Sequence, residues 1–191
     1  MTSDQVIALF RETGALLEGH FLYTSGRHGQ QFLQAARVLQ YPQYTEMLCK
    51  AIAETFTRDG IEFVVGPATG GIILAYETAR HLGCCAAFSE KDGQGGMAVK
   101  RGFALRKGIR VLVVEDITTT GGSAQKTVAH LRSRGADVRA VAVLIDRSDG
   151  AVQFDCPFVP LARLPLASYV PAECPLCKQG LPLIEPDDLT A

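Results

Sequence analysis

The most constraining feature of this chain is an apolar run that leads directly into two acids. Residues 111–114 are Val-Leu-Val-Val, followed by Glu115, Asp116 and a segment rich in Thr and Gly that ends at Ser123. Continuous apolar runs are typical of buried parallel strands, and ligands of open α/β sheets bind beyond the carboxyl ends of such strands. We therefore expect both acids to lie at a ligand crevice.

The segment after the acids indicates anion binding. Its hydroxyls and small residues precede residues 124–134, which have helical composition, and backbone amides at a helix N-terminus bind phosphate groups. The acids can accept hydrogen bonds from vicinal sugar hydroxyls, so a ribose 5-phosphate suits the whole motif. This segment lacks the Walker A lysine and the Rossmann glycine pattern, which argues against a nucleoside triphosphatase or a dehydrogenase. The plain alternative is an acidic strand end before an ordinary helix cap.

The order of elements predicts one α/β domain with a parallel sheet covered on both faces. The N-terminal part reads as a helix over residues 3–17 with a cap at Ser3 or Asp4, a hairpin over 19–38 that turns at Ser25 and Gly26, and a helix over 44–56. The core reads as strands over 62–66, 84–88, 110–115 and 137–145, helices over 72–81 and 123–134, and a loop over 90–100. After Pro157 we expect a final strand and an irregular tail.

Composition limits the possible partners. The 191 residues are 47% hydrophobic and 20% charged with a net charge of -1, which suits a single globular domain and gives no electrostatic case for nucleic acid or membrane. No apolar segment reaches the roughly 18 residues of a membrane span, and the N-terminus does not read as a signal peptide. We expect a cytoplasmic protein.

The six cysteines do not read as a disulfide framework. Cys84 and Cys85 are expected to begin a buried strand. Only Cys174 and Cys177 have metal-ligand spacing. A structural zinc site needs a second ligand pair, and the sequence shows none nearby, so we assign this motif to a turn of the tail and keep zinc as the alternative.

Three further segments extend the predicted site. Residues 66–71, Gly-Pro-Ala-Thr-Gly-Gly, follow a predicted strand and precede a predicted helix. We expect them to form a second anion-binding loop, or simply a tight turn that needs glycine. Residues 89–101 are polar and glycine-rich, with Lys91, Lys100 and Arg101, and form a mobile lid or a solvated hairpin. Arg147 follows the strand ending at Ile145, where it either binds a carboxylate bidentately or pairs with Asp146 or Asp149.

The chain resembles the type I phosphoribosyltransferases, and among them the orotate phosphoribosyltransferases. The resemblance covers nearly the whole chain and is carried by residues 14–21, 24–28, 67–71, 115–123, 146–148 and 174–177. It implies a parallel sheet flanked by helices, with a small N-terminal hood over most of residues 1–40, a core over 60–165 and a tail over 166–191. It also implies a homodimer and Mg²⁺-dependent transfer of ribose 5-phosphate from phosphoribosyl diphosphate (PRPP) to orotate, with Mg²⁺ held mainly by PRPP.

The resemblance also implies site residues, with Lys91 and Asp116 as the catalytic ones. PRPP would contact Glu115, Asp116, Ile117, Thr118, Thr119, Thr120, Gly121, Gly122, Ser123, Thr69, Gly70, Lys91, Lys100 and Arg101. Orotate would contact Thr119, Arg147 and Arg27. Lys91 is expected to reach the neighbouring subunit's site.

The chain departs from the family pattern at two places, and three other functions compete with this assignment. Many members carry a Lys where this chain has Thr24, and their lids hold more cations than Lys91, Lys100 and Arg101. The rivals are a purine phosphoribosyltransferase, a non-catalytic PRPP-sensing regulator that binds RNA or DNA, and an interaction-only domain. Arg147 argues against the purine enzyme, and the net charge of -1 argues against the regulator. An interaction-only domain would leave the paired phosphate loops unexplained.

Overall fold

The computed structural model describes residues 1–23 and 25–186, and its larger sheet has six strands. Their order is β5-β4-β3-β6-β7-β8, and all neighbours are parallel except the antiparallel pair β4 and β5. The strands are β3 (Phe63–Pro67), β4 (Cys85–Lys91), β5 (Met97–Val99), β6 (Arg110–Thr118), β7 (Asp137–Asp146) and β8 (Phe158–Arg163). The predicted parallel α/β sheet is confirmed.

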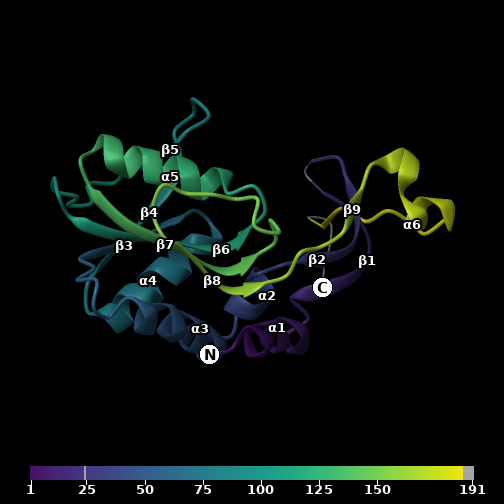
Figure 1. The fold of residues 1–191 in the computed structure, drawn as a ribbon, viewed down its shortest axis with the longest axis horizontal. Helices are drawn as coiled ribbons and strands as arrows, with labels where there is room; N and C mark the ends of the chain where they lie inside the picture. Colours follow the sequence, from purple (N-terminus) through teal and green to yellow (C-terminus); the bar gives the residue numbers. More distant parts are fainter. Residues whose placement is uncertain (24, 187–191) are drawn as a thin grey trace.

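Helices cover both faces of this sheet (Figure 1). The helices α1 (Ser3–Glu12), α3 (Pro42–Thr55) and α4 (Gly70–Leu82) lie on one face, and α5 (Gly122–Ser133) lies on the other. Successive residues of a strand point to opposite faces, so Leu112 packs in the core cluster under α3 and α4 while Val111 and Val113 pack under α5. This two-sided burial explains the uninterrupted apolar run before Glu115.

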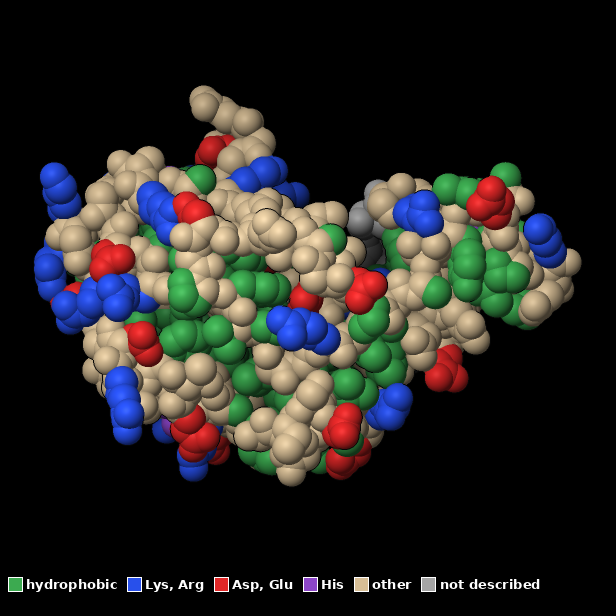
Figure 2. Space-filling model, viewed as in Figure 1, with side chains coloured by type: hydrophobic (Ala, Val, Ile, Leu, Met, Phe, Trp, Pro, Cys, Tyr) green, Lys and Arg blue, Asp and Glu red, His purple; other side chains and the backbone are tan. Residues whose placement is uncertain are grey.

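A second, smaller lobe stands beside the core and is formed by both ends of the chain (Figures 1 and 2). Its antiparallel sheet has the order β1 (Leu16–Leu22), β2 (His28–Leu33), β9 (Ser168–Tyr169). A 3₁₀ turn, η1 (Pro171–Glu173), and a one-turn helix, α6 (Pro175–Lys178), follow β9. We call β1, β2, β9 and residues 170–186 the hood lobe; the short helix α2 (Ala36–Leu39) leads from it back to the core.

The C-terminal segment pairs with the hood sheet and is not the irregular tail that the sequence predicted. Residues 168 and 169 extend the hood sheet beside β2, and Ile184 forms a parallel bridge with Phe21. The Leu22 amide donates to the Ile184 carbonyl at 2.9 Å, and the Ile184 amide donates to the His20 carbonyl at 2.8 Å. The last segment of the described chain is therefore an integral part of the lobe that begins at β1.

Several element boundaries differ from the sequence prediction. The first helix ends at Glu12 rather than residue 17, because Gly14 adopts a φ of +65° and Leu16 already belongs to β1. Its N-cap is Thr2, whose hydroxyl accepts from the Gln5 amide, not Ser3 or Asp4. The predicted burial of Cys85 is wrong, since it is exposed at the start of β4.

The surface carries acidic and basic side chains interspersed on the face shown in Figure 2. Among the helices of the described residues, none is long and apolar enough to cross a membrane.

Candidate active site

The two acids of the β6 motif point to opposite sides of the strand. The strand continues through both acids to Thr118, three residues further than predicted, because Ile117 and Thr118 pair with Ile145 and Asp146 of β7. Glu115 lines a cavity at the start of α5, and Asp116 lines a second cavity under the hood lobe. One strand end therefore serves two adjoining pockets, which share Ile117, Thr119 and Thr120.

The first pocket, of about 310 Å³, has the construction of a phosphate cradle. Its walls are polar, with lining residues Glu115, Ile117, Thr118, Thr119, Thr120, Gly121, Gly122, Ser123 and Lys126. Gly121 caps α5 at a φ of +74°, and a Cβ there would lie 2.7 Å from Cγ1 of Val152. The loop can take this turn only because residue 121 has no side chain, and the turn exposes the first amides of α5 to an anion.

Both acids are half-buried, and among the described residues neither has a compensating cation. Burial, with a smaller contribution from Asp116, raises the pKa of Glu115 to about 8. Burial also raises the pKa of Asp116, although Oδ1 of its carboxylate accepts a hydrogen bond from the Ile117 amide at 2.7 Å. Among the described residues, no Lys, Arg or His lies within 4 Å of either carboxylate. Such a pair favours a ligand that brings positive charge or hydroxyl donors.

The loop between β3 and α4 meets the second acid. A Cβ on Gly70 would lie 2.1 Å from Oδ2 of Asp116, so this backbone approaches the carboxylate more closely than any other residue type allows. A Cβ on Gly66 would lie 2.0 Å from the Gly71 carbonyl oxygen, which keeps the loop tight. The peptide bond between Ala68 and Thr69 is cis. The structure thus brings the two predicted anion-binding loops together on one edge of the sheet.

The second pocket, of about 400 Å³, lies between the core and the hood lobe. Its lining combines the strand end with hood residues: Leu22, Tyr23, Ser25, Phe32, Leu33, Gln34, Ala35, Asp116, Ile117, Thr119, Thr120, Arg147 and Pro186. Apolar and aromatic walls with a few polar groups suit a flat heterocycle.

Arg147 is the cation of this pocket, and it has no acidic partner among the residues that the structure describes. Its guanidinium carbon lies 5.0 Å from the centroid of the Tyr23 ring, and its Nε is buried without a hydrogen-bond acceptor. Burial lowers the pKa of Arg147, an effect that Tyr23 partly offsets. The alternative pairing with Asp146 is excluded, because the Asp146 carboxylate lies 3.6 Å from Arg163 and accepts from the Ser148 amide. Among the described residues no carboxylate reaches Arg147 within 4 Å, Asp149 included.

The predicted lid is a β-hairpin rather than a long loop. Residues 89–91 pair with residues 97–99, which leaves only 92–96 as a turn projecting from the core (Figure 1). Arg101 pairs with Glu90 at 2.7 Å and lies over the Phe88 ring, and Lys100 donates to the Lys91 carbonyl at 2.9 Å. Lys91, Lys100 and Arg101 line neither pocket.

Arg27 also lies away from both pockets. Its guanidinium donates to the hydroxyl and the carbonyl of Ser168 at 2.8 and 2.7 Å, which ties the hood turn to β9. Thr24 lies outside the described residues.

Sequence reasoning missed most of the hood residues that line the second pocket, and two missed side chains matter most for the chemistry, Tyr23 and Lys126. Tyr23 supplies the ring beneath Arg147 from 124 positions earlier in the chain, and no local pattern joins them. Lys126 lies one turn into α5 and lines the phosphate cradle. Its position, three residues after Ser123 on a predicted helix, was the available signal.

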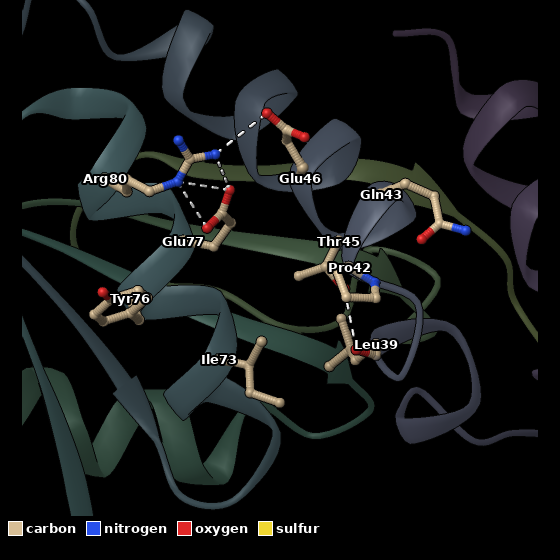
Figure 3. A pocket seen from close by; sticks show the side chains of 9 residues that line it. All are labelled: Leu39, Pro42, Gln43, Thr45, Glu46, Ile73, Tyr76, Glu77 and Arg80. Atoms are coloured by element: carbon tan, nitrogen blue, oxygen red, sulfur yellow. Dashed lines mark hydrogen bonds and ion pairs between the residues drawn. The ribbon is translucent and has the colours of Figure 1, made fainter.

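A cavity of about 640 Å³, larger than either pocket of this site, is elsewhere and lacks the features of a catalytic centre. It is an open groove between α3 and α4 (Figure 3). Its charged groups are mutually satisfied, since Arg80 pairs with Glu77 at 2.6 Å and with Glu46 at 3.2 Å. Beside them Ile73 and Tyr76 are 49% and 69% exposed, so this groove is an apolar surface rather than a site of chemistry.

Comparison with known proteins agrees with the geometry. Residues 38–159 match the model of the phosphoribosyl transferase domain. The chain is 48% identical to an orotate phosphoribosyltransferase of Pelotomaculum thermopropionicum, over 97% of both chains. It is 30% identical to the crystal structure of an orotate phosphoribosyltransferase from Aeropyrum pernix, with a TM-score of 0.73 over 83% of this chain and 93% of that one. An adenine phosphoribosyltransferase from Rhodothermus marinus, 24% identical with a TM-score of 0.65 over 83% of this chain and 99% of that one, shares the fold.

Proposed function

Because this chain belongs to the orotate phosphoribosyltransferase family, we propose that its paired pockets hold the two substrates of that reaction. The enzyme transfers ribose 5-phosphate from PRPP to orotate, giving orotidine 5'-phosphate and diphosphate in pyrimidine biosynthesis. In our assignment the phosphate cradle holds the 5'-phosphate, the pocket under the hood lobe holds orotate, and the strand end between them holds the ribose.

The observation that carries the base assignment is Arg147, which lies beside the Tyr23 ring and whose buried Nε has no acceptor among the described residues. Orotate is a flat pyrimidine with a carboxylate, so its ring can lie among the apolar and aromatic walls while its carboxylate accepts two hydrogen bonds from the guanidinium. A neutral base would leave the half-buried cation unpaired, and a site built for a partner group rejects ligands that lack it. Thr119 lines the same pocket and supplies a hydroxyl for the ring.

The strand end suits the ribose because it lies between the two adjoining pockets, with Glu115 lining one and Asp116 lining the other. Cleavage of the bond between C1 and diphosphate develops positive charge on the sugar and negative charge on the leaving group. In this proposal Glu115 and Asp116, which line the two pockets, accept hydrogen bonds from the ribose hydroxyls and stabilise the cationic ring. Catalysis then rests on positioning and electrostatics, with no general base assigned.

The residues present also fit Mg²⁺, the cofactor implied by the family. Carboxylate oxygens are the hard ligands that Mg²⁺ prefers, usually together with retained waters and substrate oxygens. Among the described residues, no Lys, Arg or His lies within 4 Å of Glu115 or Asp116 to compete for them. When bound with PRPP, Mg²⁺ neutralises charge on the diphosphate. Gly70 and Thr69 lie beside Asp116, where their loop can receive that diphosphate.

The β4–β5 hairpin supplies the remaining cations in this proposal. Lys91, Lys100 and Arg101 approach the diphosphate when the hairpin closes, with Lys91 acting in the neighbouring subunit's site. The exposed Ile73 and Tyr76 along the groove of Figure 3 give an apolar surface for a second copy of the chain, which supports a homodimer.

The test is the Mg²⁺-dependent loss of orotate absorbance after PRPP is added. We expect turnover in the native protein, and loss or strong slowing in both Arg147→Ala and Asp116→Asn. Diphosphate release with a purine base but not with orotate would keep the fold and overturn the base assignment. PRPP binding without turnover of any base, together with salt-dependent nucleic acid binding, would instead favour a regulator.

A further inference from the structure

Four potential metal ligands meet inside the hood lobe, away from both substrate pockets. They are His20 on β1, His28 on β2, Cys174 after η1 and Cys177 on α6, and their ligand atoms all lie within 4.8 Å of one another. His20, His28 and Cys174 are 3%, 6% and 0% exposed, whereas Cys177 lies at the surface. The second ligand pair that Cys174 and Cys177 need for zinc therefore exists, about 150 residues earlier in the chain. The assignment of these cysteines to a mere turn is incomplete.

Hydrogen bonding alone cannot satisfy this cluster. His20 Nδ1 lies 2.9 Å from the Leu181 carbonyl, which can only accept, so Nδ1 carries a proton and Nε2 of the neutral ring has a single lone pair. Three groups approach that one atom: His28 Nδ1 at 3.1 Å, Cys174 Sγ at 3.5 Å and Cys177 Sγ at 3.6 Å. One lone pair does not accept three donors, but four lone pairs directed at a common centre suit a cation.

The separations match those of a tetrahedral zinc site. Zn–N bonds of about 2.0–2.1 Å and Zn–S bonds of about 2.3 Å imply ligand separations of about 3.3 Å for N and N and about 3.6 Å for N and S. The corresponding distances here are 3.1 Å between the two histidines and 3.2, 3.5 and 3.6 Å between nitrogen and sulfur. The bond from His20 Nδ1 to a carbonyl is the outer contact that orients a zinc-bound histidine.

We propose that this chain binds one structural Zn²⁺ through His20 Nε2, His28 Nδ1, Cys174 Sγ and Cys177 Sγ. Two thiol protons leave to solvent on binding, so the two thiolates balance the charge of the ion. Four protein ligands leave no open position, which makes the site structural rather than catalytic. The ion would fasten residues 171–186 to the β1–β2 hairpin, and with them Pro186, which lines the base pocket.

The first experiment measures the metal content of the full-length protein, purified under reducing conditions with zinc in the growth medium. Elemental analysis should find about one zinc per chain in the wild type and close to none in Cys174→Ser and Cys177→Ser. The matched control is Cys85→Ser, since Cys85 is an exposed cysteine of the core sheet outside the cluster and should leave the zinc content unchanged.

Two further readouts keep the proposal testable if those variants fold poorly. Wild-type protein reloaded with Co²⁺ should show the intense visible bands of tetrahedral coordination and thiolate-to-cobalt charge transfer. Removal of zinc by a strong chelator should lower the melting temperature by about 5 °C or more, and added zinc should restore it. The proposal is overturned if the reduced wild type retains no metal after incubation with zinc, or if both serine variants retain it fully. A native disulfide between Cys174 and Cys177 would overturn it as well.

Discussion

The guanidinium carbon of Arg147 lies 5.0 Å from the centroid of the Tyr23 ring, and its Nε is buried with no acceptor among the described residues. The core lobe supplies the cation and the hood lobe supplies the ring, so the pair exists only when the lobes are assembled as they are here. A guanidinium over an aromatic ring can still present donors to a carboxylate. The contact therefore joins the two lobes and holds a cation in the pocket where a base that carries a carboxylate can bind.

Arg147→Ala should lower kcat/KM for orotate by about 100-fold, or ~3 kcal/mol, because the substrate carboxylate loses its buried partner. Steady-state kinetics with varied orotate, at saturating PRPP, measure this. Arg139→Ala is the control, since Arg139 lies on the same strand but is exposed and pairs with Asp137. Equal losses in the two variants would remove Arg147 from the base site.

Gly29→Ala should raise KM for orotate while leaving the affinity for PRPP nearly unchanged. A Cβ on Gly29 would lie 1.9 Å from the Tyr23 hydroxyl, so the ring beneath Arg147 must move. The neighbouring Gln30 is exposed on the same strand, and Gln30→Ala should behave as the wild type. A Gly29→Ala enzyme with normal orotate KM would show that Tyr23 does not shape the pocket.

Glu115→Gln should stabilise the substrate-free protein at pH 8 by roughly 2 kcal/mol, and much less at pH 5. Burial raises the pKa of Glu115 to about 8, so the folded state holds a proton that the unfolded state releases near its ordinary value. The native protein thus loses stability as pH rises from about 4.5 to 8. Urea unfolding at both pH values measures the difference.

Glu62→Gln provides a control of opposite sign for that experiment. A hydrogen bond from the Arg110 amide, with help from the nearby arginines, lowers the pKa of Glu62. Its ionised form therefore adds stability above its ordinary pKa, and the variant should be destabilised at neutral pH but not in acid. If Glu115→Gln followed the same trend, the buried-acid explanation would be wrong.

Lys91→Ala and Asp116→Asn should each be nearly inactive alone yet regain activity when mixed. If Lys91 serves the neighbouring subunit, a mixed dimer has one intact site of two, and random exchange of equal amounts yields about a quarter of native activity. Unfolding and refolding the variants together, followed by the orotate assay, tests this. Activity that stays at the level of the separate variants would place Lys91 in its own subunit's site or outside catalysis.

The sequence predicted best where the determinants are local. The β6 motif encodes strand, acids and phosphate loop within about a dozen consecutive residues, and the structure places them on one strand and the start of one helix. The strand end was the error, since Thr118 joins the ladder through its pairing with Asp146 of β7. Pairing between strands is decided by the neighbour and not by the local run.

Features assembled from distant segments could not be predicted in the same way. The Cys174 and Cys177 motif was visible, but His20 and His28 become its neighbours only because the C-terminal segment returns to the β1–β2 hairpin. The same holds for Tyr23 and Arg147. Isolated histidines and tyrosines carry no periodic signal, so only the tertiary fold reveals their partners.

The return of β9 to the edge of β2 also fixes the order in which the molecule can be completed during synthesis. The hairpin of β1 and β2 leaves the ribosome first, yet its outer partner, Ser168–Tyr169, and the bridge from Ile184 to Phe21 emerge only after the whole core sheet. While about 130 residues are translated, the edge of β2 has no β9 beside it, and His20 and His28 lack their contacts with Cys174 and Cys177. The base pocket, lined largely by residues 22–35, is therefore complete only after Pro186 has been made.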